Sequence, residues 1–397
     1  MRDPEMGERC FTETQRSESV RQNNRTNCSR FTMSQPESST RFFNKVVSTS
    51  TCFFSVCLVV SWLLVVGCVD GTGAAQPETV GFVGLTMGTT YSVKLARAPR
   101  GHTLKEVHQQ VERMLRHVDG LMSTYKKDSD VSRFSRSRST DWFSVSSETA
   151  TVVAEAQRIS RLSGGAFDVT VAPLVNLWHF GPEEPTRKIP TEKEIQAAKE
   201  HVGYRHLHVR LDPPALKKDI PTLSVDLSAI AKGYAVDRVA ELLESLGIDS
   251  YLVEVGGETR THGCKADGSP WRIGVEKPDT LNLSGTTVVK ILEPGDKAVA
   301  TSGDYRNFFV VGGKRYSHEI DPRTGRPVQW SLASVTVVAD SCMTADAFAT
   351  ALMVLGPSEG YNLAVAQKLA VLMIVREADG YKEKKTPEFV KLFGNDP

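Results

Sequence analysis

The sequence lacks an excess of charge of either sign. Its 397 residues carry 48 lysines and arginines against 47 aspartates and glutamates, which gives a formal net charge of +1. Proteins that hold nucleic acid through its phosphates present a strongly basic surface, and this composition provides none. We therefore expect no nucleic-acid partner.

Cysteines with metal-binding or disulfide spacing are also missing. Five of the seven cysteines lie within the first 68 residues, and the other two are Cys264 and Cys342. Neither of these two belongs to a C-x-x-C pair or has a histidine at ligand spacing, which excludes a zinc site and a disulfide framework. A single disulfide between Cys264 and Cys342 is the alternative that remains.

Common catalytic motifs and internal repeats are absent from the sequence. It contains no G-x-x-x-x-G-K-[ST], no strand-linked G-x-G-x-x-G, no H-E-x-x-H and no G-x-S-x-G. These absences leave the usual nucleotide-binding, zinc-protease and α/β-hydrolase interpretations without support. Because no period of 20–50 residues repeats, a solenoid is excluded as well.

The first 79 residues differ from the rest of the chain. Residues 1–45 are polar and predict a disordered extension, whereas 46–68 form an uncharged apolar run after basic residues. The run ends in L-V-V-G-C, which resembles a bacterial lipobox with Cys68 as the lipidated residue. We expect a lipoprotein facing the periplasm, with 69–79 as a flexible tether; an uncleaved membrane-spanning helix is the alternative.

Residues 80–393 predict one catalytic body of the α+β class, with mixed sheets and flanking helices. Apolar spacing indicates helices over 104–122, 148–162, 191–201 and 230–246, and strands over 82–96, 251–255 and 334–338. Helices and short strands do not alternate strictly, which favours α+β over a doubly wound parallel sheet.

The segment T-A-D-A-F-A-T (344–350) predicts a helix that begins after Thr344 and ends at Gly356. Asp346 and Thr350 are four residues apart, so their side chains share one face of this helix. A carboxylate and a hydroxyl suit a hard cation such as Mg2+. The alternative is an ordinary helix start, with the aspartate favoured by the dipole and the threonine bonded to the backbone.

The segment V-D-L-S-A-I-A-K-G-Y-A-V-D (225–237) predicts a strand that ends at Asp226, followed by a helix. Lys232 falls in the first turns of that helix, where a cation opposes the dipole by about a few tenths of a kcal/mol. An anionic ligand at the helix start would compensate. The alternative is a solvated lysine.

Three further segments place polar groups or glycines beside turns. In S-G-G-A-F-D-V-T, Asp168 either accepts hydrogen bonds from a ligand or caps a turn. V-G-G-E (255–258) either permits a close approach to its backbone or forms a tight turn. In Y-S-H-E-I-D-P-R-T-G, turn chemistry accounts for the D-P-x-T-G part but not for His318, which is either a general base or structural.

Taken in order, these segments resemble the ApbE family, the FAD:protein FMN transferases. The matching segments are T-M-G-T-T-Y (86–91), M-S-T-Y (122–125), G-G-A-F-D (164–168), V-D-L-S-A-I-A-K-G-Y-A-V-D, V-G-G-E, A-T-S-G-D-Y (300–305), H-E-I-D-P-R-T-G and T-A-D-A-F-A-T. The resemblance implies an α+β enzyme that binds FAD and Mg2+, passes FMN to a threonine hydroxyl of another protein and releases AMP.

The resemblance also implies roles for single residues. It implies a metal site made by Asp346, Thr350 and the backbone carbonyl of Ala229, and His318 as the base that takes the threonine proton. It implies an FAD site lined by Met87, Tyr125, Ala166, Phe167, Asp168, Lys232 and Ile320.

The acceptor implied by the resemblance carries its threonine in a D-x-x-[ST]-[GS]-A-[ST] motif, as in a redox-complex subunit. This sequence contains no such motif, so we do not expect it to modify itself. Two alternatives stay open. One is an FAD pyrophosphatase, in which water replaces the threonine, and the other is a non-catalytic flavin-binding lipoprotein.

Overall fold

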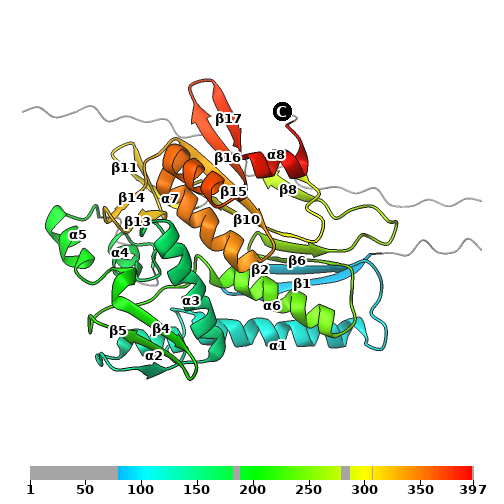
Figure 1. The fold of residues 1–397 in the computed structure, drawn as a ribbon, viewed down its shortest axis with the longest axis horizontal. Helices are drawn as coiled ribbons and strands as arrows, with labels where there is room; N and C mark the ends of the chain where they lie inside the picture. Colours follow the sequence, from blue (N-terminus) through cyan, green and yellow to red (C-terminus); the bar gives the residue numbers. More distant parts are fainter. Residues whose placement is uncertain (1–78, 182–187, 279–286, 306, 396–397) are drawn as a thin grey trace, which may run out of the picture. The chain divides into compact units, whose positions relative to one another are not determined.

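An eight-stranded antiparallel sheet forms the centre of the computed structural model, which describes residues 79–181, 188–278, 287–305 and 307–395. Figure 1 shows the sheet with its helices. In spatial order the strands are β1 (Val80–Thr86), β2 (Thr89–Leu95), β6 (Tyr251–Val255), β7 (Glu258–His262), β10 (Ala298–Gly303), β15 (Leu332–Ala339), β16 (Ala370–Glu377) and β17 (Gly380–Lys385). The expected N-terminal extension, the anchor and nearly all of the tether lie outside the described residues.

The sheet is buried on both faces at its centre. Along β16, Val371 and Met373 join one apolar cluster, and the alternate residues Leu372 and Ile374 join another. This alternation follows from the two-residue period of a strand, which sends successive side chains to opposite faces. The β-branched run in β15 therefore packs against two layers, as its composition predicted.

Three helices cover one face of the sheet and a smaller layer covers the other. The first layer consists of α1 (Leu104–Met122), α6 (Ala231–Ser245) and α7 (Cys342–Ala366). The second layer consists of α8 (Pro387–Phe393) and the hairpin of β8 (Ile273–Glu276) and β9 (Val288–Leu292). This arrangement of mixed helices and antiparallel strands confirms the α+β prediction.

Two smaller assemblies complete the fold. One contains α2 (Asp130–Arg136), α3 (Ser147–Leu162), the 3-10 turn η1 (Tyr204–His206) and a sheet of β3 (Phe143–Ser144), β5 (Pro214–Lys218) and β4 (Leu207–Leu211). The other, which we call the aromatic lobe, contains α4 (Ala172–Leu177), α5 (Glu192–Lys199), β11 (Phe308–Val311), β12 (Lys314–Ser317), β13 (Ile320–Asp321) and β14 (Arg326–Pro327).

Stacked rings hold the aromatic lobe together. The ring of Tyr316 stacks on Trp178 at 5.6 Å and on Phe309 at 5.4 Å, and Phe180 packs against Phe309. These ring pairs add to the aliphatic contacts of Leu174, Ile195 and Ile320 in the same cluster.

Local sequence explains most helix boundaries. The side chain of Thr103 and that of Glu106 form a capping box at the start of α1, and a second box of Thr191 and Glu194 starts α5. The apolar spacing of α1 places five side chains in the core: Val107, Val111, Leu115, Val118 and Met122.

Of the two boundary predictions for α7, one was wrong and one is confirmed. The N-cap of α7 is Ser341 and not Thr344, because the Ser341 hydroxyl accepts the hydrogen bond from the Thr344 amide. The predicted end at Gly356 is confirmed: its φ of +78° is not helical, and Pro357 starts a second helix beyond this kink, so α7 as labelled joins two helices. A proline fits there because the first turn of a helix needs no amide donor from it.

The strand predicted to end at Asp226 is wrong as well. Residues 223–227 belong to no helix or strand, and the Asp226 amide donates to the Val169 carbonyl at 2.7 Å. The open disulfide alternative is also excluded, because Cys264 is exposed and Cys342 is buried, and both are free thiols.

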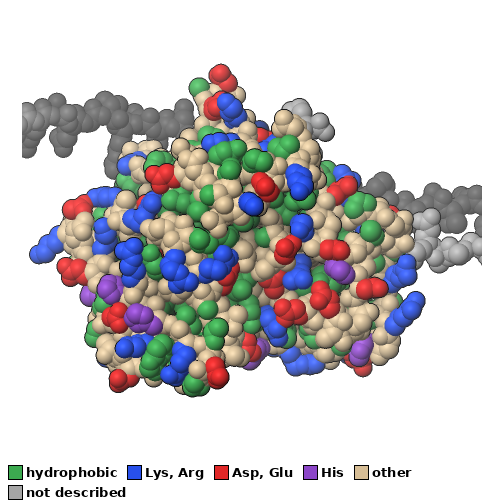
Figure 2. Space-filling model, in the orientation of Figure 1, with side chains coloured by type: hydrophobic (Ala, Val, Ile, Leu, Met, Phe, Trp, Pro, Cys, Tyr) green, Lys and Arg blue, Asp and Glu red, His purple; other side chains and the backbone are tan. Residues whose placement is uncertain are grey.

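The surface agrees with the near-neutral composition. On the face shown in Figure 2, lysine and arginine side chains are interspersed with aspartate and glutamate side chains. Within the part of the chain that the structure describes, no helix combines the length and the apolar character needed to cross a bilayer.

Candidate active site

A cavity of about 390 Å³ lies where the central sheet, the starts of α6 and α7 and the aromatic lobe meet. Its volume is within the range usual for small-molecule sites, about 300–1,000 Å³. With one exception, the predicted site residues line it: Tyr125, Ala166, Phe167, Asp168, Ala229, Lys232, His318, Ile320, Asp346 and Thr350. Segments far apart in the sequence therefore form a single site.

The exception is Met87, which does not line this cavity. It lies in the turn between β1 and β2 with φ +48°. Thr89, at the end of the same turn, packs close to Gly256: a Cβ added to Gly256 would lie 2.9 Å from the Thr89 methyl group. Gly256 lines the cavity. Met87 is therefore near the site without being part of its wall.

Lys232 is held between two buried carboxylates. Its Nζ lies 2.6 Å from Oε1 of Glu258 and 3.9 Å from Oδ1 of Asp346. Glu258 is the last residue of V-G-G-E and Asp346 lies on α7, so the three charges come from three elements. The sequence led us to expect that an anionic ligand would balance the charge of Lys232 at the helix start. In the structure, the carboxylates of Glu258 and Asp346 balance that charge.

Burial changes the protonation of this cluster. Although burial opposes its charged form, the carboxylates of Asp346 and Glu258 raise the pKa of Lys232 above its ordinary value. Burial raises the pKa of the Glu258 and Asp346 carboxyls, while Lys232 partly offsets the effect on both. A permanent cation beside them would favour their ionised forms.

Oxygen donors gather on the α7 side of the cavity. The hydroxyls of Thr350 and Ser302 share a hydrogen bond of 3.1 Å, and Oε2 of the buried Glu258 has no hydrogen-bond partner among the described residues. The Gly233 amide donates to Oδ2 of Asp346 at 3.0 Å. It makes no backbone hydrogen bond to the Ala229 carbonyl four residues earlier. Ala229 lines the cavity, and no backbone hydrogen bond to its carbonyl is formed among the described residues.

This donor set fits Mg2+, which prefers carboxylate, hydroxyl and carbonyl oxygens. The described residues contain no group of three histidine, cysteine, aspartate or glutamate side chains placed to hold a metal. The donors here are of mixed type, with one carboxylate, one hydroxyl and one main-chain carbonyl among Asp346, Thr350 and Ala229. Such a set leaves positions for water or phosphate oxygens.

The side chain of Asp168 acts within the fold. Its Oδ1 accepts from the amide and hydroxyl of Thr170, at 2.8 and 2.7 Å, and its Oδ2 accepts from the Tyr204 amide at 2.7 Å. Burial raises the pKa of this carboxyl despite these bonds. Asp168 thus lines the cavity while its carboxylate caps the turn, which is the second of the two alternatives.

His318 directly follows β12, and its ring lies at the aromatic lobe. Nδ1 is 3.1 Å from the carbonyl oxygen of Asn307. Because a carbonyl only accepts hydrogen bonds, Nδ1 carries the proton in the neutral ring and Nε2 has the free lone pair. Nε2 lies 3.7 Å from Oε1 of Glu319, and the ring packs edge-on against Phe180.

Several cavity residues received no role from the sequence. Glu319 is buried beside His318, and burial raises its pKa. Ser302 belongs to A-T-S-G-D-Y and Glu258 to V-G-G-E, so the motifs contained them, but the sequence did not reveal which side chains face inward. A buried carboxyl in a cavity is itself a signal of a functional site.

Comparison with known proteins shows the family of the chain. Residues 87–373 match the ApbE family. FAD:protein FMN transferases from Vibrio cholerae and Escherichia coli K12 are 49% and 42% identical to the chain, over 83% and 85% of it and 96% of each relative. The solved flavin transferase ApbE of Vibrio cholerae has a TM-score of 0.73 at 48% identity, over 80% of this chain and 99% of its own.

The apo flavinyl transferase ApbE of Pseudomonas stutzeri gives a TM-score of 0.74 at 42% identity, over 81% of this chain and 99% of its own. The sequence match and the structural match therefore cover the same body, which contains the cavity. On these grounds the chain belongs to the ApbE family.

Proposed function

We propose that this enzyme, a transferase, takes an FMN group from FAD and transfers it to a threonine hydroxyl of an acceptor protein, with Mg2+ at the site. One observation supports this above the others. Apart from Met87, the residues expected to bind FAD, hold the metal and take the proton line one cavity, in a chain whose relatives are named FAD:protein FMN transferases.

The reaction exchanges one P–O bond for another. The threonine oxygen forms a bond to the phosphorus of the FMN half, and the bond from that phosphorus to the bridging oxygen breaks. The bridging oxygen leaves with AMP and keeps the electron pair. The hydroxyl proton needs an acceptor on the enzyme, and no covalent enzyme intermediate is required.

His318 is the residue placed to accept that proton. The Asn307 carbonyl fixes its Nδ1–H tautomer, so Nε2 is available as the base. The edge-on contact with Phe180 restrains the ring at the cavity wall. His318 thus combines a defined orientation with access to the cavity.

With Mg2+ to offset the two carboxylates beside Lys232, the site would suit a diphosphate. Mg2+ held by Asp346, Thr350 and the Ala229 carbonyl would stabilise the charge that develops on the phosphate oxygens. Lys232 lies at the second residue of α6, where the free amides and the helix dipole also favour an anion. Phe167 and the exposed Tyr125 offer ring surfaces for the isoalloxazine or adenine.

The acceptor and the location are further parts of the proposal. We place the acceptor threonine in a D-x-x-[ST]-[GS]-A-[ST] motif, for example in a subunit of a redox complex. We place the enzyme at a bacterial membrane, facing the periplasm and anchored by a lipid on Cys68. The apolar run before Cys68 and its L-V-V-G-C end support this location.

The direct test incubates the purified full chain with FAD, Mg2+ and an acceptor fragment that carries the motif. The matched control is the same fragment with its threonine changed to valine. We expect covalent flavin fluorescence on the first fragment only, with one AMP released for each flavin attached. Free FMN and AMP with an unlabelled acceptor would instead support hydrolysis, and an absence of AMP would refute both reactions.

A further inference from the structure

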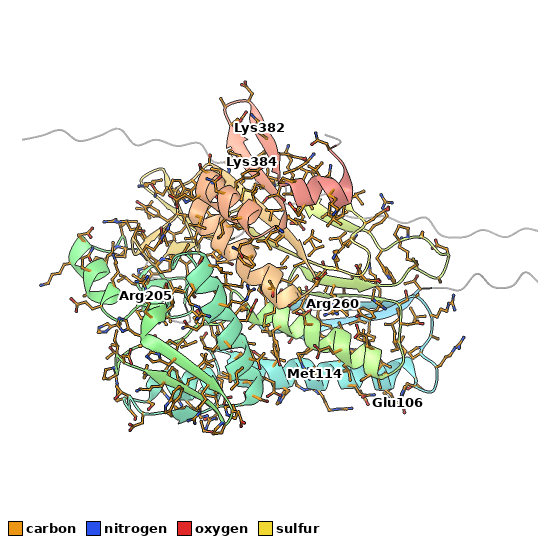
Figure 3. All side chains as sticks on the ribbon, viewed as in Figure 1. Glu106, Met114, Arg205, Arg260, Lys382 and Lys384 are labelled. Carbon is orange, nitrogen blue, oxygen red and sulfur yellow. The ribbon has the colours of Figure 1, made fainter. Side chains whose placement is uncertain are left out.

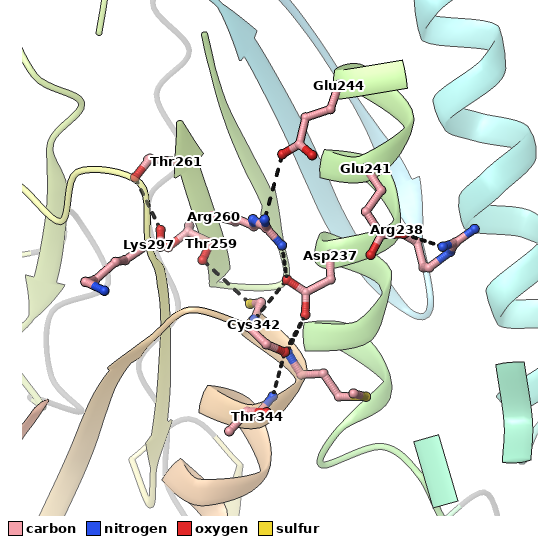
Figure 4. Close-up of polar contacts among 12 residues, drawn as sticks. Asp237, Arg238, Glu241, Glu244, Thr259, Arg260, Thr261, Lys297, Cys342 and Thr344 are labelled. Carbon is pink, nitrogen blue, oxygen red and sulfur yellow. Dashed lines mark hydrogen bonds and ion pairs between the residues drawn. The ribbon is translucent and has the colours of Figure 1, made fainter. Parts of the chain in front are cut away.

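The carboxylate of Asp237, on α6, binds the first turn of α7. Its Oδ1 accepts from the Cys342 amide at 2.9 Å, and its Oδ2 accepts from the Met343 amide at 2.9 Å and the Ser341 hydroxyl at 2.8 Å. Figure 4 shows Asp237 of α6 bonded to Cys342 at the start of α7. One side chain of α6 therefore satisfies two of the unpaired amides at the start of α7.

Arg260 supplies the opposite charge to this carboxylate. Its Nη1 donates to Oδ1 of Asp237 at 2.9 Å, and Glu244 lies 3.7 Å from its Nη2. Figure 3 labels Arg260 where α6 and the start of α7 meet. Asp237 is thus buried, ion-paired and fully hydrogen-bonded, and does not face the cavity described above.

A second contact between the same helices lies one turn away. Gly233 is four residues before Asp237, so both face α7. A Cβ on Gly233 would clash with the Cys342 carbonyl and lie 2.8 Å from Cβ of Asp346. The Gly233 amide also donates to Oδ2 of Asp346. The two helices therefore touch at Gly233 and are tied together at Asp237.

The opposite side of the α7 start is tied to α3. The Thr344 hydroxyl donates to Oε1 of Glu155 at 2.8 Å, and Glu155 forms a two-bond pair with Arg158. This bond involves a side chain only, whereas Asp237 binds the backbone of α7. The axial position of α7 relative to α6 therefore depends more directly on Asp237.

We propose that Asp237 is a positioning residue for the active site. By binding the start of α7, it sets the position of Asp346, which lies one turn further along α7, against Gly233 and Lys232 of α6. Its link to metal binding rests on the proposed function, in which Asp346 is a metal ligand. Groups that orient metal ligands from outside typically change metal affinity by about 10–100-fold when they are removed.

The test compares Asp237→Asn with Glu241→Gln in the full chain. Both changes remove one carboxylate charge from α6, but Glu241 is exposed and pairs only with Arg238 in the described contacts. Hydrogen exchange of the Gly233 amide reports its bond to Asp346. Titration with Mn2+ alone measures metal binding without turnover, and the paramagnetic signal of the free ion gives the fraction bound.

For Asp237→Asn we expect faster exchange at Gly233 and metal binding weakened by about tenfold or more. We expect no change in the KM for the acceptor. The Glu241→Gln variant should match the wild type in each measurement. Ser341→Ala removes one bond to Asp237 together with the N-cap bond to the Thr344 amide, and Ser341→Gly, which is a nearly neutral change for the cap itself, separates the two effects. Both variants should show the same changes to a smaller extent, and they cover the case in which Asp237→Asn does not fold.

Exchange at Gly233 and metal affinity that both stay at wild-type values in Asp237→Asn, or in both Ser341 variants if Asp237→Asn does not fold, would overturn the proposal. A wild-type chain that binds no Mn2+ would instead contradict the metal site of the proposed function, and the exchange rates alone would then decide the role of Asp237.

Discussion

The Nζ of Lys232 lies 2.6 Å from Oε1 of Glu258 and 3.9 Å from Oδ1 of Asp346, so one buried ammonium faces two buried carboxylates. When all three groups are ionised, this cluster carries one uncompensated negative charge. An unpaired buried charge is strongly unfavourable unless a further cation joins it. In the proposed function, Mg2+ at Asp346, Thr350 and Ala229, which line the same cavity, would supply that further cation.

Changing Asp346 to alanine should remove most of the Mg2+-dependent activity. A metal that stabilises phosphate oxygens contributes several kcal/mol, so we expect kcat to fall by about a hundredfold or more. FAD binding should weaken less, because other parts of the cavity also contact the substrate. Turnover measured against Mg2+ concentration, with FAD binding followed by fluorescence, checks both expectations.

The control for this change is Asp340→Ala. Asp340 lies before the start of α7, its side chain is 91% exposed, and it pairs with Lys297 on the surface. Its loss should leave the metal dependence unchanged. Transfer at the wild-type rate by Asp346→Ala in the presence of EDTA would remove the metal from the mechanism.

Replacing His318 with glutamine should slow transfer without weakening FAD binding. Glutamine can still donate a hydrogen bond to the Asn307 carbonyl, but it cannot accept a proton at neutral pH. Loss of a general base typically reduces the rate by about 10²–10⁴-fold. Single-turnover measurements at saturating FAD report this step directly, and a rate equal to that of the wild type would exclude His318 as the base.

Local patterns predicted those parts of the site that lie within one element. Asp346 and Thr350 share a helix face because they are four residues apart, and this needs no knowledge of the fold. The position of His318 directly after β12 was equally local. The resemblance to a family added which segments meet, but it did not supply the directions of single side chains.

Interactions between distant residues decided the rest. The sequence predicted Thr344 as the N-cap of α7, whereas Ser341 caps the helix and Asp237, 105 residues before Cys342, binds the turn that begins after Ser341. Lys232 was expected to attract an external anion because its partners, Glu258 and Asp346, follow it only at large separations in sequence. Such pairings depend on tertiary structure, which propensities do not contain.

The Cys68→Ser variant tests the membrane anchor. Without a thiol at this position no lipid can be attached, so we expect the protein to move from the membrane fraction to the soluble periplasmic fraction. Cys57→Ser, a change of the same type within the apolar run, is the control and should stay with the membrane. Retention of Cys68→Ser in the membrane would favour an uncleaved spanning segment.

Lys218 should make stability depend on alkaline pH. Its buried Nζ donates to the carbonyls of Phe134, Ser135 and Leu223. Burial, together with nearby Arg138, lowers its pKa from the ordinary 10.5 to about 8. Between about pH 8 and pH 10.5, Lys218 is protonated in the unfolded chain and neutral in the folded one. The free energy of unfolding therefore rises with pH over this range, by about 3 kcal/mol.

Urea unfolding of the wild type and of Lys218→Met at pH 7, 9 and 10.5 checks this contribution. Methionine leaves three carbonyls without a donor, so the variant should be less stable at each pH. Its free energy of unfolding should lack the rise that Lys218 causes in the wild type. Parallel pH profiles for the two proteins would contradict the lowered pKa of Lys218.

Gly233→Ala should reduce both stability and activity, because α6 and α7 touch at this residue. The added methyl group would clash with the Cys342 carbonyl and press on Asp346. Overpacking of this kind costs about 1–3 kcal/mol, and here the strain would fall on a proposed metal ligand. Gly120→Ala is the control: Gly120 lies within α1 with open space around it, so the same change should stabilise by about 0.5–1 kcal/mol. Thermal unfolding and Mg2+-dependent turnover of both variants distinguish the two sites, and equal behaviour would show that α6 and α7 can separate at Gly233 without harm.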